Sequence, residues 1–185
     1  MSDEESHAVP DDHIVLIGRV AETWAQFEFH VDQAIWSLVN AEQQLLACIT
    51  SQFLSMHPRM RAYIAICSIH GLSKQTITKL NKFSGRISGL ADKRNRAVHD
   101  PRYRRNSDGK ICRLEITARP TVQFDFLPED KEDLKTTIRQ ITKAVHEFIG
   151  LHVEVIDEIQ AIPPEDRPQV LQIIPDVWTP QSPTN

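Results

Sequence analysis

Two side chains near the middle of the chain, Arg94 and His99, are of the types that carry out acid–base chemistry on a phosphate. A guanidinium can hold a phosphate through two parallel hydrogen bonds, and an imidazole can transfer a proton near neutral pH. Asn95 precedes His99 by four residues, so on a helix its amide can fix the imidazole tautomer. Arg94 precedes His99 by five residues, about 140° around a helix, and must rely on its long side chain or on a loosened last turn.

The same region is strongly basic. Residues 93–113 contain eight basic and two acidic residues, a net charge of +6, whereas the whole chain has a net charge of −4. A basic patch on an acidic protein indicates either a polyanion site or a solvated arginine-rich loop, and charge alone favours the loop. If the patch binds single-stranded RNA by charge and stacking, the residues we expect to do so are Arg96, Arg102, Tyr103, Arg104 and Arg105.

No metal or cofactor site is predicted. Cys48, Cys67 and Cys112 are odd in number and widely scattered, which argues against a disulfide framework and against a cysteine-based zinc site. His146 and His152 are six residues apart, about 240° around a helix, so they cannot chelate one metal ion. His152 falls at a core-facing position, where we expect it to be hydrogen-bonded. The chain contains no His-Glu-x-x-His, Gly-rich phosphate loop or Gly-x-Ser-x-Gly motif.

The elements that must position these residues are predicted to be mostly helices. Apolar residues at alternating spacings of three and four predict two long helices, over residues 12–40 and 130–161, which we expect to lie along one another. Shorter helices are predicted over 41–53, 58–70 and 73–99, with Pro58 at the first helical position (N1) and Ser73 as an N-cap. Pro101 must end the helix that carries Arg94 and His99.

A change of period follows that helix. Residues 112–116 and 122–126 alternate between apolar and polar types on either side of Pro120, which predicts a β-hairpin over about 110–126. We expect its apolar face to lie on the helices, because a lone hairpin is marginally stable in water. The predicted fold class is therefore mainly α, a helical bundle with an inserted β-hairpin before the last helix.

The ends of the chain differ in composition from this predicted domain, residues 12–162. Residues 1–11 are acidic and predicted to be disordered, and residues 163–185 hold six of the eleven prolines and are predicted to be extended. No basic-then-apolar leader and no membrane-length apolar run is present. We therefore expect a cytoplasmic protein without a membrane partner.

The segment Arg94-Asn95-Arg96-Ala97-Val98-His99 resembles the Arg-x4–6-His motif of HEPN domains, in which an Asn often follows the Arg. The resemblance to uncharacterised bacterial HEPN-like proteins spans about residues 14–160, although only the Arg-Asn…His core is sharp. Glu28, Asp32 and Ile35 match early positions of that pattern. Asp100 departs from it, because a small residue is common after the histidine and a carboxylate there would oppose a nearby phosphate.

The resemblance implies a metal-independent endoribonuclease, as in toxin or phage-defence systems, with Arg94, Asn95 and His99 as its catalytic residues. The 2′-hydroxyl of RNA would attack the adjacent phosphate, which requires a base, an acid and a cation. One chain offers one Arg–His pair, so a symmetric dimer with the helix end at or near its interface makes better chemical sense. The alternative is a non-catalytic helical dimer that binds a nucleotide, RNA or a protein partner such as a cognate antitoxin or regulator.

Overall fold

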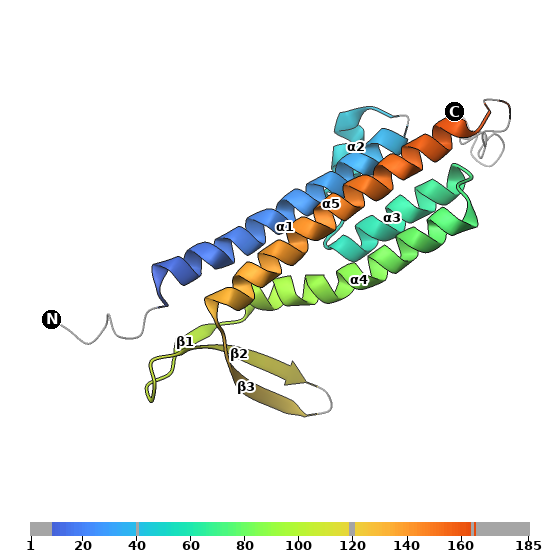
Figure 1. Ribbon diagram of the computed structural model, residues 1–185. Helices are drawn as coiled ribbons and strands as arrows, with labels where there is room; N and C mark the ends of the chain where they lie inside the picture. Colours follow the sequence, from blue (N-terminus) through green and yellow to red (C-terminus); the bar gives the residue numbers. More distant parts are fainter. Residues whose placement is uncertain (1–8, 40, 119–120, 164, 166–185) are drawn as a thin grey trace, which may run out of the picture.

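The computed structural model describes residues 9–39, 41–118, 121–163 and 165. The elements found there are α1 (Asp11–Leu38), α2 (Gln43–Thr50), α3 (Met56–Ile69), α4 (Lys74–His99), β1 (Arg102–Arg104), β2 (Ile111–Ala118), β3 (Val122–Pro128) and α5 (Lys131–Ala161) (Figure 1). The mainly α fold with strands inserted before the last helix confirms the predicted fold class. The predictions for residues 1–11 and 163–185 lie largely outside the described residues.

The two long helices α1 and α5 lie side by side along the length of the bundle, as predicted (Figure 1). Neither helix is broken, and the apolar stripe of each faces the other elements. The residues of these stripes that are buried include Val20, Trp24, Phe27, Val31, Leu134, Ile141, Phe148 and Val155. Periodicity therefore predicted both the extent of these helices and the faces that they bury.

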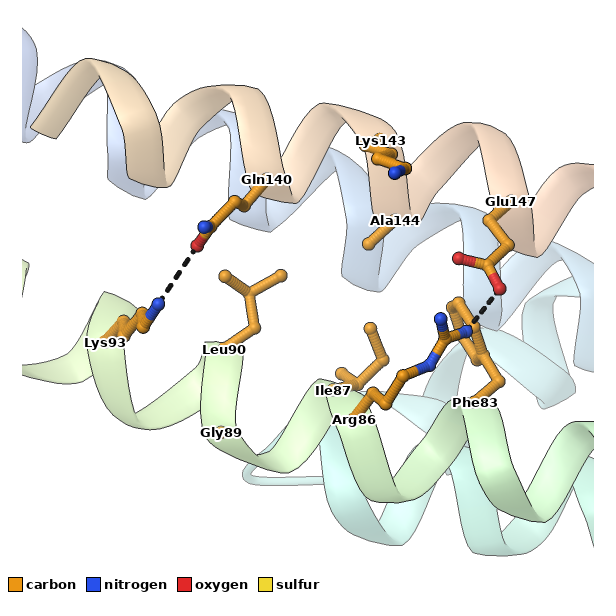
Figure 2. Close-up of a pocket in the computed structure, with 10 residues that line it drawn as sticks. All are labelled: Phe83, Arg86, Ile87, Gly89, Leu90, Lys93, Gln140, Lys143, Ala144 and Glu147. Atoms are coloured by element: carbon orange, nitrogen blue, oxygen red, sulfur yellow. Dashed lines mark hydrogen bonds and ion pairs between the residues drawn. The ribbon is translucent and has the colours of Figure 1, made fainter. Parts of the chain in front are cut away.

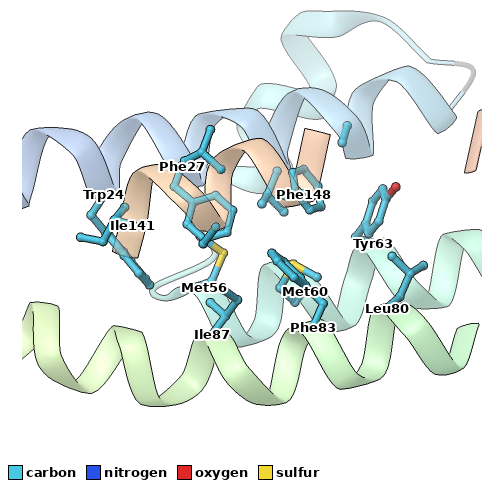
Figure 3. Packing of buried hydrophobic residues seen from close by; sticks show 14 of the residues in the cluster. Trp24, Phe27, Met56, Met60, Tyr63, Leu80, Phe83, Ile87, Ile141 and Phe148 are labelled. Carbon is cyan, nitrogen blue, oxygen red and sulfur yellow. The ribbon is translucent and has the colours of Figure 1, made fainter. Parts of the chain in front are cut away.

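An aromatic cluster joins four helices in the centre of the core (Figure 3). The ring centroids of Phe27 on α1 and Phe148 on α5 are 6.0 Å apart in an edge-on arrangement. Phe83 on α4 stacks on Phe148 at 6.0 Å, and Tyr63 on α3 meets the same ring at 5.3 Å. This cluster fixes α4 against the long helices, and so determines where the end of α4 lies.

Local signals set the helix ends. The Ser73 hydroxyl accepts a hydrogen bond from the Thr76 amide at 3.3 Å, as expected of an N-cap, and Gly71 has the positive φ of 81° that favours glycine after a helix. Asp130 and Asp133 form a reciprocal capping box at the start of α5. Helix α3 begins at Met56, two residues before the predicted Pro58, which remains in the first turn where an amide proton is not needed.

The strands differ from the prediction in two ways. Strand β1 pairs antiparallel with β2, so the hairpin of β2 and β3 is part of a three-stranded sheet with the order β1-β2-β3. The apolar face of the hairpin does not lie on the helices, because Phe124 and Phe126 are 62% and 59% exposed. The opposite, charged face meets the helix ends instead, where Arg102 pairs with the buried Glu129 and Arg113 with the half-buried Asp100.

Candidate active site at the end of helix α4

The last two turns of α4 bring Arg94, Asn95 and His99 together at the surface. Arg94 Nη1 lies 3.4 Å from His99 Nε2 and donates a hydrogen bond to Asn95 Oδ1 at 3.0 Å. The helix stays regular to His99, so the long arginine side chain bridges the angular gap. His99 and Asn95 are exposed, and Arg94 is half-buried.

The contact between Arg94 and His99 indicates which nitrogen atom donates and which accepts. A guanidinium has donors only, so the contact makes His99 Nε2 the acceptor and places the proton of a neutral imidazole on Nδ1. Arg94, and not Asn95 as the spacing suggested, contacts the imidazole nitrogen, while Asn95 orients the guanidinium. The pair therefore holds a proton acceptor beside a permanent cation.

The carboxylate of Asp100 is balanced by a neighbouring cation. Asp100 is the C-cap of α4, and Arg113 Nε of β2 lies 3.4 Å from Asp100 Oδ2. Arg113 also lies 3.5 Å from Glu115, which in turn forms an ion pair with Arg96. The negative charge of Asp100, next to His99, is thus offset by Arg113 of β2. The spacing of residues in the sequence does not predict this partner.

Comparison with known proteins does not change this description of the end of α4. No family model, no curated protein and no solved structure matches this chain.

Arg102 is one of the predicted RNA-binding residues, but its side chain is buried and bonds to other groups of the protein. Its side chain is 5% exposed, and its Nε donates to Glu129 Oε2 at 2.6 Å. It also donates to the carbonyl oxygens of Ala97 at 2.7 Å and Asp100 at 2.9 Å, which caps the end of α4. Arg102 therefore positions the helix end that carries His99.

Glu129 is the centre of this buried network. His13 Nε2 of α1 lies 3.0 Å from Glu129 Oε2, and Arg113 Nη1 lies 3.5 Å from Glu129 Oε1. Burial by itself would raise the pKa of Glu129, but hydrogen bonds from Arg102 and His13 outweigh it and lower the pKa. Because its partners lie 27 and 116 positions away, sequence spacing could not reveal this network.

The other predicted RNA-binding residues have different environments. Tyr103 is 49% exposed, and its ring meets Phe126 at 6.1 Å. Arg105 Nε donates to Asp108 Oδ1 at 2.9 Å, and this hydrogen bond lowers the pKa of Asp108 to about 2. Arg104 is half-buried, and its Nε has no hydrogen-bond partner. Of this group, Arg104 keeps the most donor capacity for a ligand.

Four buried polar atoms of the described residues have no hydrogen-bond partner: Arg94 Nε, Asp100 Oδ2, Arg104 Nε and Arg113 Nε. Arg113 Nε and Asp100 Oδ2 lie 3.4 Å apart as an ion pair, so these two atoms compensate one another. The Nε donors of Arg94 and Arg104 are left, and an unsatisfied buried donor is costly unless a ligand supplies the acceptor. An oxygen of an anion would satisfy either donor.

Glu28 and Asp32, two residues of the family pattern, have a structural partner in Arg59. Arg59 Nε donates to Asp32 Oδ1 at 3.0 Å, and Arg59 Nη1 lies 3.4 Å from Glu28 Oε1. Burial raises the pKa of Asp32, although Arg59 partly opposes this effect. Ile35 is buried in the core. These residues therefore join α1 to α3 rather than face His99.

A groove lies between α4 and α5, and none of Arg94, Asn95 and His99 lines its two cavities. Polar contacts cross it at seven-residue intervals: Lys79 with Glu154, Arg86 with Glu147, and Lys93 with Gln140. A cavity of about 430 Å³ lies between the last two contacts. Figure 2 shows its lining residues, of which Ile87, Leu90 and Ala144 are apolar. A second cavity of about 330 Å³ continues past Lys93 to Arg96 and Arg113.

No metal site competes with this assignment in the part of the chain that the structure describes. No group of three or more His, Cys, Asp or Glu side chains there is arranged to hold a metal ion.

His152 is hydrogen-bonded in the core as predicted, with its Nδ1 2.8 Å from the Tyr63 hydroxyl and its Nε2 3.2 Å from Ser37 Oγ. Within the same residues, no helix is long and apolar enough to span a membrane.

Proposed function

We propose that this chain is a metal-independent endoribonuclease of the HEPN type that acts in the cytoplasm. The observation that carries the proposal is the 3.4 Å contact between Arg94 Nη1 and His99 Nε2 at an exposed helix end. The Nε donors of Arg94 and Arg104, which are buried without a hydrogen-bond partner, further support an anionic substrate. The resemblance of the Arg94–His99 segment to the HEPN motif supplies the reaction class.

In this proposal His99 and Arg94 divide the chemistry between them. His99 Nε2 removes the proton of a 2′-hydroxyl, whose oxygen forms a bond to the adjacent phosphorus while the bond to the 5′-oxygen breaks. The Arg94 guanidinium stabilises the charge that develops on the phosphorane oxygens. The products are a 2′,3′-cyclic phosphate and a free 5′-hydroxyl, whose proton must come from a second acid.

The same pair in a second copy would supply that acid. A single chain brings one imidazole and the guanidinium that contacts it to the helix end, whereas the reaction uses a base and an acid on opposite sides of the phosphorus. We therefore propose a symmetric homodimer with the two α4 ends at or near one cleft.

A second candidate function is binding without cleavage. Arg96, Arg102 and Arg113 are all held in ion pairs with carboxylates, which reduces the positive charge available to a transition state. In that case the helix end would bind a nucleotide, RNA or a regulatory protein partner.

The deciding experiment is incubation with mixed RNAs in excess EDTA. The wild type should cut RNA and leave 2′,3′-cyclic phosphates or their opened forms, and it should leave DNA intact because DNA lacks the 2′-hydroxyl. His99→Ala should reduce the rate by about 10²–10⁴-fold through loss of proton transfer. Arg94→Lys should also be severely impaired, because an ammonium cannot form the bidentate contact with a phosphate.

Exposed residues of the same types provide matched controls. His146→Ala and Arg61→Lys, on α5 and α3, should cut at the wild-type rate. Arg104→Ala should mainly weaken RNA binding and reduce its salt dependence by about one phosphate contact. Equal cutting by wild type and His99→Ala would reject the proposed active site, and RNA binding without any cutting would favour the second candidate.

A further inference from the structure

Strand β3 lies at the edge of the sheet, and its outer side has no partner among the residues that the structure describes. The sheet has the order β1-β2-β3, so β3 pairs with β2 alone. Figure 1 shows the hairpin of β2 and β3 projecting from one end of the bundle. The backbone groups along the outer side of β3 are therefore open to hydrogen bonds from another strand.

The register shows which backbone groups lie on that outer side. The Leu114 amide donates a hydrogen bond to the carbonyl oxygen of Pro101 at 2.9 Å, so it points away from β3. Leu114 lies opposite Phe126. Residues opposite one another in an antiparallel pair either exchange backbone hydrogen bonds or both point these groups away from each other. The amide and carbonyl of Phe126 therefore point outward, and those of Phe124 and Val122 do so by alternation.

The same three residues carry exposed apolar side chains. Val122, Phe124 and Phe126 are 60%, 62% and 59% exposed, and they share one face of the sheet because their positions differ by two. Natural proteins usually protect an edge of this kind with lysine, proline or a bulge. Strand β3 contains no lysine and no bulge, and its one proline, Pro128, is its last residue. The edge is thus suited to accept a further strand.

One carboxylate determines which strand fits best. Asp125 lies on the other face of β3, between Gln123 and Leu127, and is exposed. Among the described residues, Asp125 has no ion-pair partner. A strand paired with β3 would place one side chain directly opposite Asp125, where an opposite charge stabilises the pair and a like charge destabilises it. The complementary residue at that position is therefore Lys or Arg.

We infer that β3 binds an extended segment of a partner protein, which adds a fourth, antiparallel strand to the sheet. Hydrogen bonds with the outward backbone groups of Val122, Phe124 and Phe126 hold the segment, as in other cases of strand addition. The segment alternates apolar residues, which pack beside the phenylalanine rings, with basic residues, one of which faces Asp125. The inference goes beyond the proposed function, since it does not depend on an active Arg94–His99 pair.

A second copy of this chain and single-stranded RNA fit this edge less well. The two-fold antiparallel pairing that uses all seven residues of β3 places Asp125 opposite the same residue of the copy, and these like charges destabilise the pair. RNA could stack on Phe124 and Phe126, but such sites also have cations that follow the phosphates. The described residues of β3 include no cation, and Asp125 would repel a phosphate.

The test uses a synthetic peptide as long as β3, in which lysine alternates with valine and both ends are blocked. In an NMR titration at up to millimolar concentration, the peptide should bind the wild type one to one and slow amide exchange at Val122, Phe124 and Phe126. A peptide methylated at the amides that would face β3 should not bind, because it cannot donate the backbone hydrogen bonds. A peptide with glutamate in place of lysine should bind about 10-fold more weakly.

Asp125→Lys separates pairing at β3 from general attraction between charges. This exposed substitution should reverse the preference, so that the glutamate–valine peptide binds more tightly than the lysine–valine peptide. Asp157→Lys, which makes the same change of charge at an exposed position of α5, should keep the wild-type preference. If Asp125→Lys does not fold, the methylated peptide and the exchange pattern of the wild type decide the question.

Three results would overturn the inference. The first is a wild type that binds no lysine–valine peptide, or that binds the methylated peptide equally well. The second is slow exchange at Val122, Phe124 and Phe126 that depends on protein concentration without peptide, which would favour a second copy. The third is slow exchange at these residues on addition of single-stranded RNA, which would favour a stacking surface. Failure of RNA cleavage would count against the proposed function alone.

Discussion

At the residue scale, the candidate site divides into a part that spacing could predict and a part that it could not. Arg94, Asn95 and His99 lie within one helix, so their proximity follows from helical geometry. Arg102 belongs to the same basic run, yet strand alternation turns it inward to Glu129. That carboxylate also contacts His13 of α1, and such long-range pairs depend on tertiary packing that local spacing does not encode.

The buried network predicts a large effect for Glu129→Gln. The substitution removes the negative charge that balances Arg102, and it replaces one of the two oxygens that accept from Arg102, Arg113 and His13 with an NH2 donor. Breaking a buried ion pair from one side costs about 3–5 kcal/mol, so the free energy of unfolding in urea should fall by about that amount. Glu154→Gln, which breaks the exposed pair with Lys79, should cost about 1 kcal/mol or less. Similar losses for the two variants would show that the network does not stabilise the fold.

At the element scale, the helices were predictable because their apolar stripes repeat over many turns. The starts and ends followed from Ser73, Gly71 and Pro101, whose conformational preferences act locally. The direction in which the sheet faces was not predictable in the same way. Alternation identifies two faces of a strand, but ion pairs with Glu129 and Asp100, outside the strands, determine which face meets the helices.

Two glycines, Gly89 on α4 and Gly109 in the turn between β1 and β2, allow a test of how glycine contributes to stability. A Cβ added at Gly89 would meet no atom within 4 Å, so Gly89→Ala should raise the free energy of unfolding by about 0.5–1 kcal/mol through lower backbone entropy of the unfolded chain. Gly109 also has open space around it, but its φ is +66°. Gly109→Ala should therefore lower stability by about 1–2 kcal/mol, because the added Cβ disfavours the left-handed conformation. Thermal or urea unfolding would measure both changes, and changes of the same sign would contradict this account.

At the scale of the whole molecule, His152 connects three helices in the core. Its imidazole bridges Tyr63 of α3 and Ser37 of α1, and its ring stacks on Phe148 with an interplanar angle of 8°. Burial lowers the pKa of His152 below its ordinary value of 6.5. The folded protein therefore keeps this imidazole neutral at a pH where the unfolded chain has begun to protonate it.

This difference predicts that the molecule loses stability in mild acid. Since the unfolded state binds the proton first, the contribution of His152 is complete above its ordinary pKa and decreases as the pH falls through about 6.5 toward the folded value. One group can change the free energy of unfolding by at most about 1.4 kcal/mol per pH unit.

Urea unfolding at several pH values between about 7.5 and 5.5 should show this decrease in the wild type, in a range above the ordinary pKa of carboxyl groups. The decrease should be smaller in His152→Gln, which cannot protonate, and unchanged in His146→Gln, which alters an exposed histidine of the same helix. Parallel pH profiles for the wild type and His152→Gln would mean that the neutral state of this imidazole does not contribute to the stability of the fold.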